Sequence, residues 1–408
     1  MQELDRIIEQ SNNDLKPVFD ELDRIEFENT KKVLNAFKEN KVSDAHFHGT
    51  TGYGYGDMGR EAIENIFADV FKGEDALVRS QFISGTATIS SCLFGILRPG
   101  DTVLSINGKP YDTLDEVIGI VDNPSSLKAW GVKYEHVELR DGKFDIPYIV
   151  DRVSKNDIKL IIAQRSRGYL YRDAFTIDEF EKVFKSIRDV NNTAFIMVDN
   201  CYGEFTEERE PLEVGADVIV GSLIKNPGGG IAKTGGYVVG KKAIIDLVSD
   251  RYSAPGLGKE GGATFEQNRD ILQGFFMAPH VVNQALKTAV FASYCLEKLG
   301  FETSPKYNEK RSDIVQMIKF QNPDKLIKYC QGIQGTSPVD SHVLPMPWDM
   351  PGYTDKVVMA SGAFTSGSSI EISCDGPIRA PYVAYQQGGL TYQSGKLAVI
   401  NAIEILYK

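Results

Sequence analysis

Two stretches of the chain, AFIMVDN at residues 194–200 and DVIVGSLIKNPGGG at residues 217–230, decide its fold and most of its chemistry. Each opens with an apolar, β-branched run typical of a buried strand, and the runs end on the polar side chains of Asp199 and Ser222. The segment between the runs is long enough for the crossover connection that parallel strands need. We therefore expect Asp199 and Lys225, which lies in the glycine-rich turn, at neighbouring strand ends.

A strand-ending carboxylate followed by a lysine in a glycine-rich loop indicates a site for pyridoxal 5'-phosphate. The Lys225 amine can form a Schiff base with the cofactor aldehyde. A carboxylate at Asp199 can keep the pyridine nitrogen protonated and the ring electron-poor. The sequence thus predicts that both side chains face one ring.

The wider pattern predicts an α/β fold. Apolar runs at residues 101–106, 158–164 and 236–240 alternate with helical patterns, as do the two runs above. Such alternation builds a mostly parallel sheet covered by helices. Ligands in open sheets of this kind gather beyond the carboxyl ends of the strands, where Asp199 and Ser222 are expected.

The chain is predicted to have three parts. Residues 1–48 form a charged, amphipathic helical arm, and residues 49–280 form the large α/β domain that binds the cofactor. Residues 281–408 form a small α+β domain that begins with a helix after Pro279. Its strand candidates are SHVLPM (341–346), KVVMAS (356–361) and SIEISC (369–374).

Composition excludes several classes of function. The formal net charge of -11 and the lack of a basic patch disfavour nucleic acid and anionic membranes as partners. No stretch is apolar enough to span a bilayer, and the start, MQELDRIIEQ, lacks the apolar core of a signal peptide. The five cysteines are widely spaced, which argues against a disulfide framework and against zinc-binding pairs. A cytoplasmic location is therefore expected.

The segment FISGTATIS indicates a phosphate-binding cup. Ser84, Gly85 and Thr86 open a helical pattern, where free backbone amides and the helix dipole can hold a phosphate. Ser222 could add a hydroxyl to the same group. Taken alone, Ser84 could instead be a plain helix N-cap, and Ser222 could satisfy local backbone.

Tyr111 and Arg379 are candidates for the ring and the substrate. Tyr111 follows a predicted strand and could stack on the pyridine, or it could anchor the next helix. Arg379 follows a strand of the small domain and offers a planar fork for a substrate carboxylate, although any single arginine can be a surface residue.

Three motifs do not carry the function that their pattern suggests. Ser222 to Lys225 matches S-x-x-K, but Pro227 and the glycines after it prevent the helix that this motif requires. Residues 54–59 match G-x-G-x-x-G without the preceding buried strand of a dinucleotide site. His46 and His48 could lie on one face of a strand, but no carboxylate or cysteine cluster beside them indicates a metal.

The chain resembles the methionine gamma-lyase-like group of fold-type I pyridoxal phosphate enzymes, often called aluminium resistance proteins and related to cystathionine beta-lyase. The segments that carry the resemblance are HFHGTTGYGYGDMGRE, FISGTATIS, VDNCYGEF, GSLIKNPGGGIAKTGGYVVG and DGPIRAPYVAYQQGGLTY. The resemblance implies the aspartate aminotransferase fold, with a seven-stranded sheet in the large domain. It also implies a homodimer or homotetramer with shared active sites.

The same resemblance implies a role for each candidate residue. Lys225 would be the Schiff-base lysine, Asp199 the partner of the ring nitrogen, Tyr111 the stacking aromatic and Arg379 the carboxylate-binding arginine. Ser84, Gly85, Thr86 and Ser222 would lie near the phosphate. Tyr55 and Arg60 are the possible equivalents of a tyrosine and an arginine that reach the phosphate from the adjacent subunit.

The working hypothesis is lysis of a carbon-sulfur bond in a sulfur-containing amino acid. Arg379 orients the substrate and Lys225 removes the Cα proton, while Tyr111 or Tyr55 protonates the leaving thiolate. The residues leave β- and γ-elimination equally open. Transamination, aldol cleavage and a non-catalytic stress-response role remain alternatives, because one fold hosts many chemistries.

Overall fold

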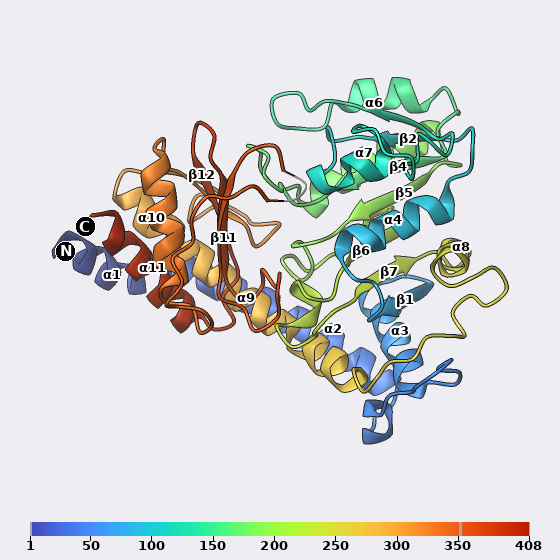
Figure 1. Ribbon diagram of the computed structural model, residues 1–408, viewed down its shortest axis with the longest axis horizontal. Coiled ribbons are helices and arrows are strands. Elements are labelled where there is room, and N and C mark those ends of the chain that lie inside the picture. The colour runs from blue at the N-terminus through green and yellow to red at the C-terminus, as the bar shows by residue number, and fades with distance from the viewer. Residues whose placement is uncertain (1, 351–352, 408) are drawn as a thin grey trace.

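The protein consists of two bodies, each built on one β-sheet, with a long helix between them (Figure 1). The computed structural model describes residues 2–350 and 353–407. The long helix, α9 (Asn268–Lys298), runs from the larger body into the smaller one (Figure 1).

The larger body holds a seven-stranded sheet that is parallel except for β7, so the predicted mostly parallel sheet is confirmed. Each interior strand is a nearly continuous apolar run because helices cover both faces of the sheet. In spatial order the strands are β1 (Asp75–Arg79), β7 (Gly236–Gly240), β6 (Val218–Ser222), β5 (Phe195–Asp199), β4 (Leu160–Gln164), β2 (Thr102–Ser105) and β3 (Lys133–His136).

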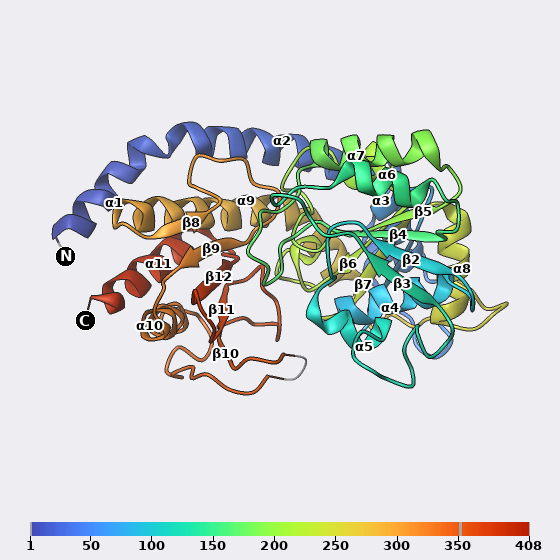
Figure 2. The ribbon, with the colours of Figure 1, turned by 90° about the horizontal axis from the view of Figure 1, so that it is seen from above.

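Two layers of helices cover this sheet, one on each face (Figure 2). Alternate strand residues pack against opposite layers; Ile196 faces one core and Met197 the other. One layer contains α3 (Met58–Phe71), α6 (Ile146–Val153) and α7 (Ile177–Val190). The other contains α4 (Gly85–Ile96), α5 (Asp115–Ile118) and α8 (Lys242–Tyr252).

The smaller body is an antiparallel five-stranded sheet packed on α9 and α10 (Pro323–Gln334), and α11 (Tyr392–Leu406) packs on these two helices. In spatial order its strands are β10 (Val357–Ser361), β11 (Ser373–Pro377), β12 (Val383–Gln387), β9 (Gln316–Lys319) and β8 (Glu302–Ser304).

The strand predictions for this body were correct only in part. KVVMAS forms β10, whereas SIEISC overlaps β11 only at its last two residues, because the strand runs on to Pro377. SHVLPM forms no strand: its apolar side chains Val343, Leu344 and Met346 are exposed, so the alternation there marks no buried face.

The amino-terminal helices α1 (Gln2–Asp14) and α2 (Lys16–Glu39) form the predicted charged helical segment, and α2 lies alongside α9 of the same chain (Figure 2). Asn283 of α9 donates to Asp23 at 2.7 Å, and the Tyr294 hydroxyl donates to Asp14 at 2.6 Å. None of the helices among the described residues has both the length and the apolar content needed to cross a bilayer.

The prediction that a helix starts after Pro279 was wrong, since α9 begins at Asn268 and passes through this proline. A proline inside a helix costs about 3 kcal/mol, because it removes one hydrogen bond and crowds the preceding turn. Burial of the neighbouring Phe275, Ala278 and Val282 offsets that cost here. The proposed domain boundary at residue 280 thus lies within a continuous helix, and the division into three parts stays a prediction.

Candidate active site

The carboxyl ends of β4, β5 and β6 bring the predicted cofactor residues together. Asp199 ends β5 in register with Gln164 of β4 and Val220 of β6, and Ser222 ends β6. Asp199 and Lys225 line the same cavity, whose volume is about 70 Å³. The larger body also supplies Tyr111, Gln164, Ser166, Gly168, Tyr169, Cys201 and Tyr202, and the smaller body supplies Val315, Asp375 and Gln387.

Lys225 is held by a tight turn that follows β6. The glycine-rich sequence permits a short 3-10 turn over Asn226–Gly228, and Gly229 follows at φ +53°, which favours glycine. Asn226 donates to the Glu204 carbonyl at 3.0 Å and so fixes the turn to the loop after β5. The Lys225 amine points over the ring of Tyr202, 4.1 Å from its centre.

The two charged groups of the cavity depend on each other. Burial disfavours the ammonium form of Lys225, but the neighbouring acidic groups favour it more strongly, so the pKa of the amine is raised. Burial raises the pKa of Asp199, and both Lys225 and the Cys201 N–H, which donates to it at 3.1 Å, oppose that rise. The Asp199 carboxylate is therefore stabilised by a cation in the cavity.

The predicted phosphate cup lies beside Ser222. Ser84 is the N-cap of α4 and accepts from the Ala87 N–H at 3.1 Å, as the plain capping interpretation proposes. A Cβ on Gly85 would lie 3.6 Å from the Ser222 Cβ and 3.7 Å from the Cys201 sulfur. Thr86 shares a hydrogen bond of 2.8 Å with Thr113.

The Ser222 hydroxyl is buried and has no hydrogen-bond partner within residues 2–350 and 353–407. A buried hydroxyl without a partner is costly, so this oxygen is suited to a ligand. Together with Gly85, which carries no side chain beside it, and the helix N-terminus, this oxygen fits the phosphate of the pyridoxal phosphate predicted from the sequence. Lys225 and Asp199 in the same cavity fit its aldehyde and its ring nitrogen.

Tyr111 lies in the cavity, and three further tyrosines that the sequence analysis did not identify surround it. The Tyr111 N–H donates to the Gln164 side chain at 3.0 Å, and its hydroxyl contacts that of Tyr353. Tyr169 lies with its ring centre 6.2 Å from Tyr111, and Tyr202 lies under Lys225. Burial, followed by the nearby tyrosines, holds the pKa of the Tyr111 hydroxyl well above its ordinary value.

Asp375 and Gln387 were also missed, because no motif marks them. They come from β11 and β12 of the smaller body and reach the cavity only through the packing of the two sheets. The one sequence signal was the segment DGPIRAP, in which Arg379 attracted attention instead.

Arg379 is not among the residues that line the cavity. Its guanidinium is half-exposed and donates to Asp355 at 2.9 Å. A role in carboxylate binding thus stays a prediction that requires this ion pair to open.

Tyr55 and Arg60 are likewise not brought to the cavity within one chain. Arg60 is buried and donates to the carbonyls of Gly54 at 2.6 Å, Gly262 at 2.7 Å and Glu260 at 3.0 Å, so it fixes a loop. Tyr55 is 58% exposed. Their predicted contribution to a second subunit stays a prediction.

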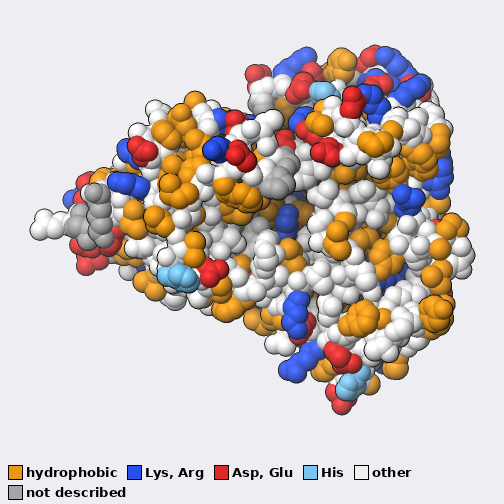
Figure 3. All heavy atoms as spheres, viewed as in Figure 1, with side chains coloured by type: hydrophobic (Ala, Val, Ile, Leu, Met, Phe, Trp, Pro, Cys, Tyr) orange, Lys and Arg blue, Asp and Glu red, His pale blue; other side chains and the backbone are white. Residues whose placement is uncertain are grey.

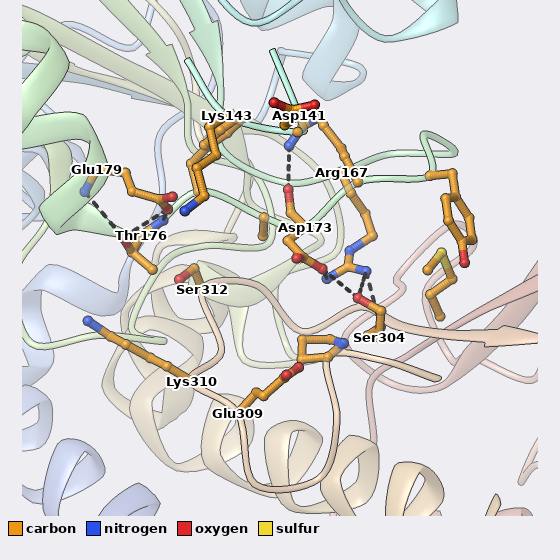
Figure 4. A pocket seen from close by; sticks show the side chains of 17 residues that line it. Asp141, Lys143, Arg167, Asp173, Thr176, Glu179, Ser304, Glu309, Lys310 and Ser312 are labelled. Atoms are coloured by element: carbon orange, nitrogen blue, oxygen red, sulfur yellow. Dashed lines mark hydrogen bonds and ion pairs between the residues drawn. The ribbon is translucent and has the colours of Figure 1, made fainter. Parts of the chain in front are cut away.

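A larger cavity of about 550 Å³ is lined by Arg167, Tyr171 and Arg172, from the same segment as Ser166 and Tyr169 (Figure 4). Several of its charged side chains are already engaged by neighbouring groups. Arg167 donates to Ser304 at 3.0 Å, Glu179 accepts from the Thr176 N–H at 2.9 Å, and Lys310 pairs with Glu207 at 2.6 Å. The smaller cavity combines an amine with an opposing carboxylate, and the free Ser222 hydroxyl ends the strand that leads to its lysine.

The face drawn in Figure 3 is hollowed where the two bodies meet.

Across the described part of the chain, no group of three or more histidine, cysteine or acidic side chains is placed to hold a metal ion. His46 lies in a 3-10 helix, not in a strand, and its ring contacts the Ser43 hydroxyl at 3.0 Å.

Comparison with known proteins gives close relatives over the whole chain. The family model for methionine gamma-lyase matches residues 4–407. An uncharacterized protein of Bacillus subtilis, YnbB, is 50% identical over 96% of this chain and 94% of its own length. A carbon-sulfur lyase involved in aluminum resistance, solved from Clostridium novyi, superimposes with a TM-score of 0.95 at 47% identity and covers 99% of this chain and 96% of its own.

A methionine gamma lyase of Micromonospora echinospora, CalE6, has the same fold. It is 16% identical, with a TM-score of 0.60 over 89% of this chain and 93% of its own.

Proposed function

The chain belongs to the methionine gamma-lyase family, and we propose that it is a pyridoxal phosphate-dependent lyase that breaks a carbon-sulfur bond in a sulfur-containing amino acid. One observation carries the proposal. Lys225 and Asp199 line one small cavity, and the unpartnered Ser222 hydroxyl lies beside Gly85 at the start of α4. The carbon-sulfur lyase from Clostridium novyi supports the reaction class.

Bound pyridoxal phosphate supplies an electron sink for the substrate α-carbon. Lys225 would hold the aldehyde carbon, and its amine, when free, would take the substrate Cα proton. Asp199 would keep a proton on the ring nitrogen, because its buried carboxylate needs a cationic partner. Ser222 and the first amides of α4 would hold the phosphate.

Tyr111 is the favoured proton donor to the leaving sulfur. It lines the cavity, and burial keeps its hydroxyl protonated at neutral pH. Tyr55, the other candidate from the sequence, is exposed in this chain. Both β- and γ-elimination need the same proton removal and the same donor, so the choice between them depends on the substrate.

Loading the protein with the cofactor, reducing it with borohydride and mapping the labelled peptide tests the assignment of Lys225. We expect the label on Lys225 only, and we expect Lys225→Ala to lose at least about a thousandfold in the rate of thiol release. Lys233→Ala is the matched control, because Lys233 follows the same turn but is exposed and pairs with Asp270.

The activity itself is tested by measuring thiol, ammonia and keto acid from methionine, homocysteine, cysteine and cystathionine. Release of all three products from at least one of these supports the proposal. Turnover that requires an added keto acid and releases no thiol would show an aminotransferase instead. If the protein stays colourless after incubation with pyridoxal phosphate, the assignment of this cofactor is also wrong.

A further inference from the structure

The wall of the cavity opposite the larger sheet has an excess of hydrogen-bond acceptors. We propose that Asp375 and Gln387, with Tyr169 and Tyr353, form a subsite that selects substrates carrying a positive charge in the side chain. The charge is an ammonium or a sulfonium group. This inference rests on the proposed function, because it names the substrate class of the same site.

The acceptors lie on neighbouring strands. Asp375 of β11 pairs with Tyr385 of β12, and Gln387 of β12 pairs with Ser373 of β11. Both side chains are 6% exposed, and both line the cavity with Lys225. The Asp375 Oδ1 and the Gln387 Oε1 have no hydrogen-bond partner in the described part of the chain. Buried acceptors without a donor are rare in proteins, which points to a donor that a ligand supplies.

The charges in the cavity favour a cation at this place. Among the described residues that line it, Lys225 is the one with a basic side chain. In the loaded protein its amine is committed to the cofactor, and Asp199 is matched to the ring nitrogen. Asp375 is then a buried carboxyl without a cationic partner, since Arg379 outside the cavity pairs with Asp355. A substrate cation satisfies it, whereas an anion is repelled.

Aromatic rings complete the subsite. The ring centre of Tyr169 lies 5.4 Å from that of Tyr353 and 5.1 Å from that of Tyr385. The face of an aromatic ring attracts cations, and cages of such rings recognise methylated ammonium groups. Two of these tyrosine hydroxyls already have partners within the protein. The Tyr385 hydroxyl donates to the Tyr169 carbonyl at 2.9 Å, and the Tyr353 hydroxyl contacts that of Tyr111.

The ionisation of Asp375 agrees with this geometry. Burial raises the pKa of its carboxyl to about 7, although the Tyr169 hydroxyl and Lys225 lower it in part. A bound cation favours the ionised form, so binding of a charged side chain and loss of the Asp375 proton support each other.

Binding of two unreactive amino acids to the cofactor-loaded protein tests the proposal without reference to turnover. L-Ornithine and L-norvaline have the same chain length, but only ornithine carries a side-chain ammonium. We expect calorimetry to show ornithine binding at least about tenfold more tightly, and Asp375→Asn to remove that preference while norvaline changes less than about threefold. S-Methylmethionine against methionine provides the sulfonium arm; because both carry carbon-sulfur bonds, their binding is measured from the rapid change in the cofactor spectrum before turnover, and Tyr169→Leu should weaken that arm more than the ammonium arm.

Glu302→Gln is the matched control, because Glu302 is an exposed acid on β8 of the same sheet and pairs with Lys319. Gln387→Glu adds a carboxylate to the subsite and should raise the preference for ornithine several-fold, which keeps the test decisive if Asp375→Asn does not fold. Equal binding of ornithine and norvaline by the unaltered protein, or a preference that survives in Asp375→Asn, would overturn the subsite. A clear preference in a protein that releases no thiol from any substrate would overturn the proposed reaction and leave the subsite standing.

Discussion

Ser222 allows binding of the cofactor to be separated from stability of the fold. Its hydroxyl is buried without a partner, so Ser222→Ala removes no hydrogen bond from the protein as it stands. We expect the free energy of unfolding of the cofactor-free protein to change by less than about 0.5 kcal/mol. Cofactor affinity should fall about 10- to 150-fold, the value of one lost hydrogen bond to a charged phosphate.

Urea unfolding and fluorescence titration with the cofactor measure the two quantities. Ser249→Ala is the contrasting control, because the Ser249 hydroxyl is also buried but donates to the Asp246 carbonyl at 2.9 Å. It should cost about 1 kcal/mol of stability and leave cofactor affinity unchanged. The reverse pattern would show that Ser222 is structural.

The buried Glu204, next to the turn that carries Lys225, should make the stability of the fold depend on pH. Burial raises the pKa of its carboxyl to about 8, although the Tyr237 hydroxyl, which donates to it at 2.7 Å, opposes the rise. An unfolded glutamate titrates near its ordinary pKa, about 4.3. Between these two pH values the unfolded chain holds fewer protons, so this group lowers stability as pH rises from about 4 to 8.

Glu204→Gln keeps the acceptor for Tyr237 and removes the titration. We expect the variant to match the unaltered protein near pH 4 and to exceed it in unfolding free energy by a growing margin up to pH 8, since each pKa unit corresponds to about 1.4 kcal/mol. Thermal unfolding across this pH range measures the margin. A difference that stays flat across this pH range for Glu204→Gln would refute the raised pKa of Glu204.

The sequence identified those residues whose place follows from one strand and its loop. Asp199 and Ser222 end strands, and Ser84 caps the helix that follows β1, so pattern alone located them. Asp375 and Gln387 could not be found this way, because their place depends on how the second sheet packs against the first. Pattern equally could not reveal that Arg379 pairs with Asp355.

At the scale of elements, the loop of residues 49–59 is fixed by the start of α3. Asp57 caps this helix through the Arg60 N–H at 2.9 Å and also accepts from Thr50 at 2.6 Å, Thr264 at 2.5 Å and Asn268 at 2.9 Å. Burial raises the pKa of Asp57, but these hydrogen bonds outweigh it, and the net pKa is lowered. The carboxylate therefore stabilises the fold at neutral pH.

Asp57→Ala should lower the free energy of unfolding by about 3 kcal/mol, because it removes a cap and leaves several buried donors unpaired. Asp57→Asn keeps an acceptor at the cap and should cost less than half as much. Urea unfolding of the two variants checks the order. Because the lowered pKa ties this stability to the ionised form, the gap between Asp57→Ala and the unaltered protein should shrink as pH falls below the ordinary value for aspartate.

Elements with a strong local pattern were predicted, and elements without one were not. The apolar runs of β2, β4, β5, β6 and β7 were all located, whereas the edge strand β3, with the sequence KYEH, has no buried face to reveal it. The strand β1 (DALVR) was missed as well. Pro279 misplaced the start of α9, because burial of the helix overrides the local preference of one residue.

At the scale of the whole molecule, the surface around the phosphate cup suggests contact with a second copy of the chain. Ile83, next to Ser84, is 85% exposed, and Tyr53, Tyr55 and Phe265 are 78%, 58% and 60% exposed. Tyr53 and Tyr55 stack with ring centres 5.5 Å apart on the loop that Asp57 and Arg60 fix. A rigid loop that presents aromatic side chains to solvent is typical of an interface.

Mixed oligomers test whether this loop completes the active site of a partner. Tyr55→Phe removes the hydroxyl predicted to reach across, and Lys225→Ala removes the cofactor lysine; each variant alone should have little thiol-releasing activity. If Tyr55 acts in the partner's site, a hybrid dimer has one active site in which an unaltered Lys225 faces an unaltered Tyr55. Half of the randomly formed dimers are hybrids, so refolding the two variants together should restore about a quarter of the full activity. If Tyr55 acts within its own chain, each of the two active sites in a hybrid contains one of the two substitutions, and no activity returns. Tyr148→Phe, on an exposed tyrosine of α6, serves as the control and should leave activity unchanged both alone and in hybrids.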